Sequence, residues 1–185
     1  MLGLKRGTVK LCPHEEAWER EAEATIRTLR AILEDLAPDL AHVGSTSVPS
    51  IMAKPIVDIA VGVEDFGRVL EKRPALEAAG FWLRPSSIEG QLLFAGGSWY
   101  TGEGEEQTHF IHVVKKDGRD WHDYLNFRDY LRAVPEAARE YEALKLSLAA
   151  ANPEDPGREK YLAGKHDFIR RTLKKAAAWA EERDS

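Results

Sequence analysis

Cysteine is almost absent from this sequence, in which Cys12 stands alone. A single cysteine excludes a disulfide within the chain, and we expect a protein of a reducing compartment, the cytoplasm. Apolar runs of about 18 residues are also missing, and so is the apolar stretch of a signal peptide, so no membrane association is expected. The net charge is −5, with no concentration of basic residues. Nucleic acid is therefore not an expected partner.

The remaining composition is that of an ordinary globular protein. Hydrophobic residues make up 43% and charged residues 31% of the 185 positions, which argues against disorder. We expect a single domain over residues 1–185, with a sheet core at about 8–114 and a helical part at about 120–183. A sheet followed by a helical layer is an α/β (α+β) architecture.

Apolar periodicity and turn residues predict the individual elements. Pro74 should interrupt the second helix, and the glycine-rich stretch 95–104 should be a mobile loop. The predicted strands are 8–11, 40–43, 56–63, 80–83, 88–94 and 107–114. The predicted helices are 13–36, 65–79, two that begin near 120 and 135, and a last one at about 159–180.

Residues 42–59 are the most informative segment. A strand ends in Gly44 and Ser45, and the next apolar strand contains the carboxylate of Asp58. Backbone amides at a glycine can approach a phosphate closely, a serine hydroxyl adds a donor, and a neighbouring carboxylate can hold Mg²⁺ on phosphate oxygens. The structural alternatives are a tight turn at the glycine and a salt bridge from the carboxylate to Lys54, Arg128 or Lys165. Both interpretations stay open from these residues alone.

The same segment resembles the signature of the GrpB family, GST-x-VPG-x(3)-KP-x-hDI, where h is apolar. This chain reads GST-S-VPS-IMA-KP-I-VDI, with Ser50 in place of the usual glycine. Further likenesses follow in order at 108–114, 125–132, 141–145 and at Tyr161 with Lys165. The resemblance implies a nucleotidyltransferase-like fold, a mixed sheet flanked by helices, but no defined reaction. In some actinobacterial relatives a similar domain is fused to dephospho-CoA kinase and is associated with aiding that kinase.

One position departs from the pattern of active nucleotidyltransferases. These enzymes carry two carboxylates at alternate positions of one strand, so that both face one metal site. Here the second position is Ala60, and a two-metal mechanism lacks a ligand. Glu89 and the histidines are the candidates to replace it.

Two histidines, His109 and His112, lie on the last predicted strand. Histidine is a metal ligand and a general base near neutral pH. Residues three apart on a regular strand face opposite sides. We therefore expect one histidine in the site and one packed elsewhere, in preference to a joint zinc site.

Three cations complete the set of candidates. Arg128 falls on the apolar stripe of its helix, so its guanidinium needs an anionic partner, which is Asp58, the neighbourhood of Asp129 or, as we prefer, a bound phosphate. Lys54 follows the Gly-Ser turn and could neutralise phosphate charge or lie on a solvated loop. Lys165 opens the last helix, where the helix dipole disfavours a cation, and this conflict favours a specific role.

These residues favour a nucleotide-dependent nucleotidyl- or phosphoryl-transferase that uses Mg²⁺ with ATP or another nucleotide and acts on a small-molecule acceptor. The alternative is a catalytically silent nucleotide- or phosphate-binding accessory protein with a protein partner, and a histidine-assisted metal-dependent phosphohydrolase ranks third. The predicted catalytic residues are Asp58, which is also the metal ligand, His112 and Arg128. The predicted cofactor-binding residues are Gly44, Ser45, Thr46, Lys54, His109 and Lys165.

Overall fold

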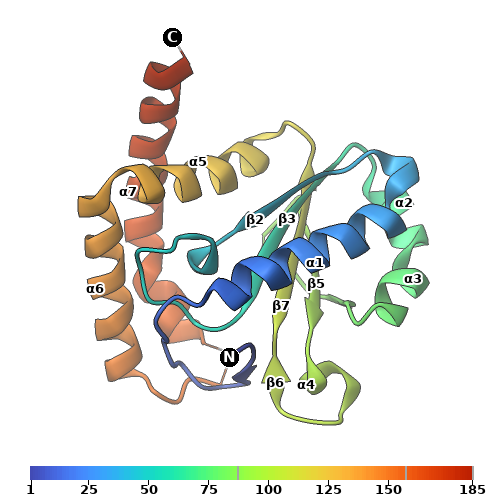
Figure 1. Ribbon diagram of the computed structural model, residues 1–185, viewed down its shortest axis with the longest axis horizontal. Coiled ribbons are helices and arrows are strands. Elements are labelled where there is room, and N and C mark those ends of the chain that lie inside the picture. Colours follow the sequence, from blue (N-terminus) through green and yellow to red (C-terminus); the bar gives the residue numbers. More distant parts are fainter. Residues whose placement is uncertain (87, 157, 185) are drawn as a thin grey trace.

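The computed structural model describes residues 1–86, 88–156 and 158–184 (Figure 1). Its strands are β1 (Leu4–Lys5), β2 (Asp39–Val43), β3 (Val57–Val63), β4 (Trp82–Arg84), β5 (Leu92–Gly96), β6 (Glu106–Gln107) and β7 (His109–Lys115). Its α-helices are α1 (Glu16–Ile32), α2 (Phe66–Glu71), α3 (Arg73–Ala78), α4 (Ser98–Thr101), α5 (Arg119–Ala133), α6 (Pro135–Ala151) and α7 (Glu159–Asp184). Two 3₁₀ turns, η1 (Glu34–Leu36) and η2 (Ser45–Ser47), flank β2.

The central sheet has five strands in the order β2-β3-β7-β5-β4. β3 and β7 are parallel, and every other neighbouring pair is antiparallel. A separate two-stranded sheet joins β1 to β6. The predicted α/β fold, a mixed sheet flanked by helices with a helical C-terminal layer, is confirmed.

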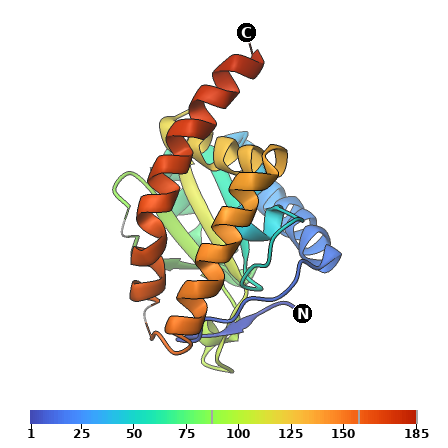
Figure 2. The same cartoon turned by 90° about the vertical axis from the view of Figure 1, so that its left-hand side faces the viewer.

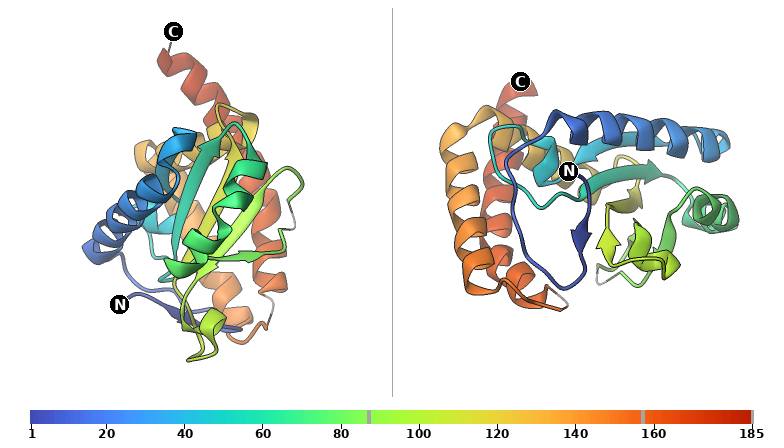
Figure 3. Two further views of the ribbon diagram at one scale, coloured as in Figure 1. Left: turned by 90° about the vertical axis from the view of Figure 1, so that its right-hand side faces the viewer. Right: turned by 60° about the horizontal axis from the view of Figure 1, so that its bottom comes forward.

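Side-chain alternation gives the central sheet two different faces. On the α1 face, Val57, Ile59 and Val61 of β3 belong to the main apolar cluster, together with Trp18 and Leu29 of α1. The stripe on α1 is apolar at helical spacing, so the helix buries it against this face. Figure 3 (left) shows α2 and α3 beside the strands.

The opposite face, which we call the α5 face, is only partly apolar. Ala60 of β3 and Val114 of β7 pack against Trp121 of α5. The same face carries Asp58 and His112, because each lies two residues from one of these apolar positions. Although β3 is covered on both faces, it carries the carboxylate of Asp58 on the α5 face.

The C-terminal helices form a second layer, in which α6 and α7 run side by side (Figure 2). A small apolar cluster binds this layer to the turn before β3: Val48 and Ile51 pack with Leu131, Tyr141 and Phe168. The far end of α7 extends past the rest of the molecule (Figures 1 and 2). Within the described ranges, no helix has the length and apolar character needed to cross a membrane.

Several predicted boundaries are wrong. The strand at 8–11 does not form: Thr8 and Cys12 make isolated bridges, to Glu154 and Ala53, because this segment bonds to distant loops instead of to one continuous strand. The helix predicted from 13 begins at Glu16, and its last residues form the turn η1.

Other differences lie around the glycine-rich stretch. The strand predicted at 88–94 is shifted to Leu92–Gly96, and Ser98–Thr101 forms the short helix α4 within the predicted loop. Ser87, in the connection between the strands predicted at 80–83 and 88–94, lies outside the described residues. The helix at 65–79 is divided at Lys72, next to Pro74, as the sequence predicts.

Candidate functional site

Asp58 and His112 form a pair at the open part of the α5 face. The imidazole Nε2 of His112 donates to Asp58 Oδ1 at 2.9 Å. Both side chains are partly exposed, Asp58 by 27% and His112 by 19%. His112 lies directly across from Ala60 in the parallel β3–β7 register. The small alanine therefore leaves the space in which the imidazole reaches the carboxylate.

This pair answers two questions that the sequence leaves open. The partner of Asp58 is His112, and none of the three cations considered as salt-bridge partners holds it. The position beside Asp58 is occupied by a histidine and not by Glu89, which lies in the exposed turn between β4 and β5. The ring of Tyr124, on α5, also packs against His112, with 5.1 Å between the ring centroids.

Gly44 packs directly against this carboxylate. Its φ of 70° lies in the left-handed region, and a Cβ placed there would lie 2.5 Å from Asp58 Oδ2. β2 and β3 are in register at Val43 and Asp58, so the chain turns over the acid as soon as β2 ends. Only glycine permits both the turn and this approach.

The three residues after Gly44 have different roles. Thr46 is fully buried, and its hydroxyl bonds to His42 Nε2 at 2.9 Å, so it supports the turn and does not face a ligand. Ser47 donates to the Gly44 carbonyl at 2.6 Å. The hydroxyl of Ser45 has no hydrogen-bond partner among the described residues and is the one free for a ligand.

Lys54 and Lys165 meet at one aromatic ring. Their Nζ atoms lie 4.8 Å and 4.5 Å from the ring centroid of Tyr161. In the part of the chain that the structure describes, neither ammonium has a carboxylate within ion-pair distance. Burial lowers the pKa of Lys54 well below its usual value, and the nearby cations of Lys165 and Arg158 add to this effect. An anion bound between the two amines would favour the charged form of both, so this arrangement around one ring is suited to binding an anion.

The sequence interpretation missed Tyr161 as a site residue, although it stands one helical turn before Lys165. Tyr124 was missed as well. The ring of Tyr161 lies between Lys54 and Lys165, and the ring of Tyr124 packs against His112.

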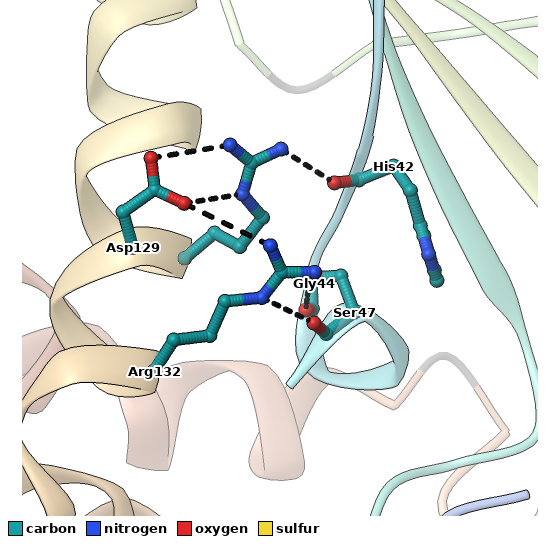
Figure 4. Close-up of polar contacts among 6 residues, drawn as sticks. His42, Gly44, Ser47, Asp129 and Arg132 are labelled. Carbon is teal, nitrogen blue, oxygen red and sulfur yellow. Dashed lines mark hydrogen bonds and ion pairs between the residues drawn. The ribbon is translucent and has the colours of Figure 1, made fainter. Parts of the chain in front are cut away.

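Arg128 has protein partners. Its guanidinium donates to both carboxylate oxygens of Asp129, at 2.7 Å and 3.1 Å, and to the His42 carbonyl at 3.1 Å. Arg132, one turn later, donates to the Ser47 carbonyl at 2.8 Å (Figure 4). Of the partners considered, the neighbourhood of Asp129 is the one found. The two arginines join α5 to the turn that carries Gly44.

His109 lies on the other face of the sheet from His112. It is 7% exposed, bonds to Thr25 Oγ1 at 3.1 Å and lies 3.3 Å from Glu21 Oε1 of α1. The prediction that the two histidines face opposite sides agrees with this geometry. His109, predicted as a cofactor-binding residue, is therefore not brought to the Asp58 site, and the two histidines do not form the joint zinc site that the sequence already disfavours. Among the described residues, no group of three or more metal-ligating side chains occurs.

Two side chains of α6 hold the loop that leads to Lys54. Glu142 Oε1 accepts from the backbone N–H of Met52 at 2.5 Å, and Lys145 Nζ donates to the Met52 carbonyl. Lys145 is 1% exposed, and burial lowers its pKa to about 7, with Lys165 nearby acting in the same direction.

The buried lysine predicts a dependence of stability on pH. In the unfolded chain the pKa of Lys145 returns to 10.5, so between about pH 7 and 10.5 the unfolded state binds more protons. The free energy of unfolding should therefore rise with pH in this range, more in the wild type than in Lys145→Met. Denaturant unfolding at pH 7 and 9 measures the difference, with the exposed Lys160→Met as control. Equal pH dependence in the wild type and Lys145→Met would contradict the prediction.

Fold and site together define a mixed α/β domain with a polar site between one sheet face and the C-terminal helices. The family model described as GrpB protein matches residues 8–175, and the chain belongs to the GrpB family. The chain is 37% identical over 171 residues to the Glutamate-rich protein GrpB of Alkalihalophilus pseudofirmus, covering 91% of this chain and 96% of that protein. The crystal structure of conserved protein GrpB from Enterococcus faecalis is similar at a TM-score of 0.80 and 30% identity, over 90% of this chain and 96% of that one. The predicted family is confirmed.

Two weaker similarities concern proteins with named activities. The chain is 26% identical to a dephospho-CoA kinase of Mycolicibacterium paratuberculosis, covering 96% of this chain and 48% of that protein. A structure of the Cid1 poly(U) polymerase bound to MgATP is similar over 70% of this chain and 45% of that one, at 16% identity and a TM-score of 0.43. A similarity as weak as the second carries no argument about the site.

Proposed function

We propose that the α5 face binds a nucleotide through its phosphates and transfers a nucleotidyl or phosphoryl group to a small-molecule acceptor. The observation that carries the proposal is the Asp58–His112 pair, together with Lys54 in the loop before β3 and Lys165 of α7, neither of which has a carboxylate partner among the described residues. Transfer of a phosphoryl or nucleotidyl group to a hydroxyl depends on positioning the reactants and on neutralising phosphate charge. The α5 face carries residues suited to both.

His112 would act as the general base. Its Nε2 donates to the carboxylate of Asp58, so the lone pair of the neutral ring is on Nδ1. Nδ1 has no partner in the described chain, and it is not among the fully buried polar atoms. An acceptor hydroxyl would give its proton to Nδ1, its oxygen would form the new bond to phosphorus, and pyrophosphate or a nucleoside diphosphate would leave. Asp58 would hold the ring and stabilise its protonated form.

Magnesium fits this donor set only in part. Mg²⁺ is commonly bound by one or two carboxylates together with substrate phosphates and water. Asp58 can supply the one carboxylate, and its Oδ2 is not engaged by His112. When bound, the metal would neutralise phosphate charge, while Lys54, Lys165 and the hydroxyl of Ser45 would hold the remaining phosphate oxygens.

A silent phosphate-binding accessory protein is the second candidate. Ala60 stands where a second carboxylate would be, and Asp58 is already bonded to a histidine. Such a protein would keep the lysines and the Gly-Ser turn and would need no proton transfer. The partial likeness to a dephospho-CoA kinase supports this reading.

Calorimetric titration with ATP and Mg²⁺ tests the binding part. Asp58→Asn should weaken binding at least about tenfold, a usual effect of changing a residue that holds a metal or its neighbours. The matched control is Asp117→Asn, because Asp117 pairs with His122 at 2.7 Å on the exposed surface. Equal binding by the wild type and Asp58→Asn would remove Asp58 from the site.

Turnover separates the two candidates. For a transferase, His112→Asn should retain ATP binding and lose release of pyrophosphate or ADP in the presence of hydroxyl-bearing acceptors. The control is His122→Asn. If the wild type binds ATP and releases neither product with any acceptor in a broad panel, the accessory function is favoured.

A further inference from the structure

A small pocket lies where the N-terminal segment, the start of β7 and the start of α7 meet. Its volume is about 140 Å³, below the roughly 300 Å³ of sites for drug-sized ligands, so it fits one small group. Three cations line it, Arg6, Lys54 and Arg158, and no carboxylate among the described residues does so. Figure 3 (right) shows the N-terminal segment between the C-terminal helices and α4.

Arg158 provides a buried positive charge in this pocket. It is 6% exposed, and within the described residues its guanidinium donates to neutral oxygens alone: the carbonyls of Thr8 and Lys5, at 3.0 Å and 3.2 Å, and Gln107 Oε1 at 2.8 Å. These contacts use three of its five N–H groups. Burying a guanidinium without an anionic partner costs free energy, and a bound anion would reduce this cost.

The other two cations are also unpaired. The guanidinium of Arg6 lies 4.9 Å from the ring of Trp99, and Lys54 Nζ lies 4.8 Å from the ring of Tyr161. In the described chain neither forms an ion pair, although the adjacent Lys5 pairs with Glu105 at 2.9 Å. The pocket therefore gathers positive charge in a protein whose net charge is −5.

The pocket adjoins the Asp58–His112 pair. Phe110 lines it, and Phe110 is in register with Asp58 across the β3–β7 ladder. Phe110 and His112 are two residues apart on one strand, so their side chains lie on the same face, and their ring centroids are 6.5 Å apart. A small molecule with an acidic group in the pocket would place its next few atoms at the pair.

We infer that this pocket binds the oxyanion group, carboxylate or phosphate, of an acidic acceptor. That the bound molecule is the acceptor of a transfer reaction rests on the proposed function. That the pocket binds an oxyanion does not depend on it. The proposal narrows the second substrate to small molecules that carry both a hydroxyl for transfer and an acidic group a few bonds away.

The test uses the melting temperature of the full chain as a function of inorganic phosphate or acetate at constant ionic strength. The wild type should be stabilised in a saturable way, and the anion with the lower midpoint concentration identifies the acidic group. Arg6→Gln should raise that midpoint about fivefold, because a charge-assisted hydrogen bond is lost. The matched control is Arg84→Gln, since Arg84 is also exposed and lies 5.3 Å from the ring of Tyr100 but does not line the pocket.

Two further variants separate this proposal from the proposed function. Asp58→Asn should still be stabilised by phosphate as the wild type is, even if ATP with Mg²⁺ no longer stabilises it. Lys165→Met should change the phosphate midpoint less than Arg6→Gln does. The inference is overturned if stabilisation does not saturate, if Arg6→Gln behaves like Arg84→Gln, or if Lys165→Met has the larger effect, which would place the anion at Lys165, outside the pocket.

Discussion

Gly44→Ala is expected to lower the melting temperature by roughly 6–12 °C and to abolish nucleotide binding. The left-handed φ of 70° costs a residue with a Cβ about 1–2 kcal/mol. The new methyl group would also lie 2.5 Å from Asp58 Oδ2, and relief of such overpacking costs about 1–3 kcal/mol. A total of about 3 kcal/mol corresponds to this shift in a chain of this size. Because the carboxylate must move, the Asp58–His112 bond is lost with it.

Gly102→Ala separates the two causes. Gly102 has a similar φ of 76°, but a Cβ there would meet nothing within 4 Å. This variant should therefore show the backbone cost alone, with ligand binding unchanged. Differential scanning calorimetry of both variants, with and without ATP and Mg²⁺, gives the comparison. Equal melting temperatures for the two alanines would mean that the approach of Gly44 to Asp58 is not tight in solution.

Arg128→Met is expected to destabilise the free protein by about 2 kcal/mol, or roughly 4–8 °C, and to leave ligand-induced stabilisation intact. Breaking a fully buried ion pair costs about 3–5 kcal/mol. Here the Arg128 and Asp129 side chains are 17% and 30% exposed, so solvent reduces the loss. Arg132 lies 4.0 Å from Asp129 and compensates in part. The His42 carbonyl loses its donor, which loosens the turn after β2.

The matched control for Arg128 is Arg139→Met. Arg139 pairs with Glu136 at 2.8 Å on the exposed side of α6, where both side chains are more than two-thirds exposed. Exposed pairs contribute about 0–1 kcal/mol, so this variant should melt almost as the wild type does. An Arg128→Met protein with unchanged stability and a lost response to ATP would instead assign Arg128 to a phosphate.

The sequence predicts the central sheet well because its signals are local. β3 and β7 are long apolar runs, and the stripe on α1 has clear helical spacing. The N-terminal strand could not be placed in this way. Residues 8–12 bond to Pro153 and Ala53, and no local pattern reveals partners so distant in the chain.

The sequence indicates which residues belong to the candidate site, but it does not indicate which of them bond to one another. Alternation along β7 separates His109 from His112, and the structure agrees. The bond between His112 and Asp58 depends on the parallel register of two strands 54 residues apart, which the sequence does not reveal. Arg128 illustrates the same limit, because the next residue in the chain, Asp129, satisfies most of its charge.

The contacts of Arg158 have a consequence for the order in which the chain folds during its synthesis. It donates to the carbonyls of Lys5 and Thr8, which lie 153 and 150 positions earlier in the chain, and Val9 bonds to the Pro153 carbonyl. Thr8 and Val9 therefore leave the ribosome long before Arg158 and Pro153, which fix them, exist. Contacts so far apart in sequence form late, after local helices and hairpins. Residues 3–6 can already bond to β6 and its neighbours and to the Pro55 carbonyl. Only the stretch around Thr8 and Val9 should therefore dock as a final step, and in a nascent chain that stops short of Pro153 this stretch should remain protease-sensitive.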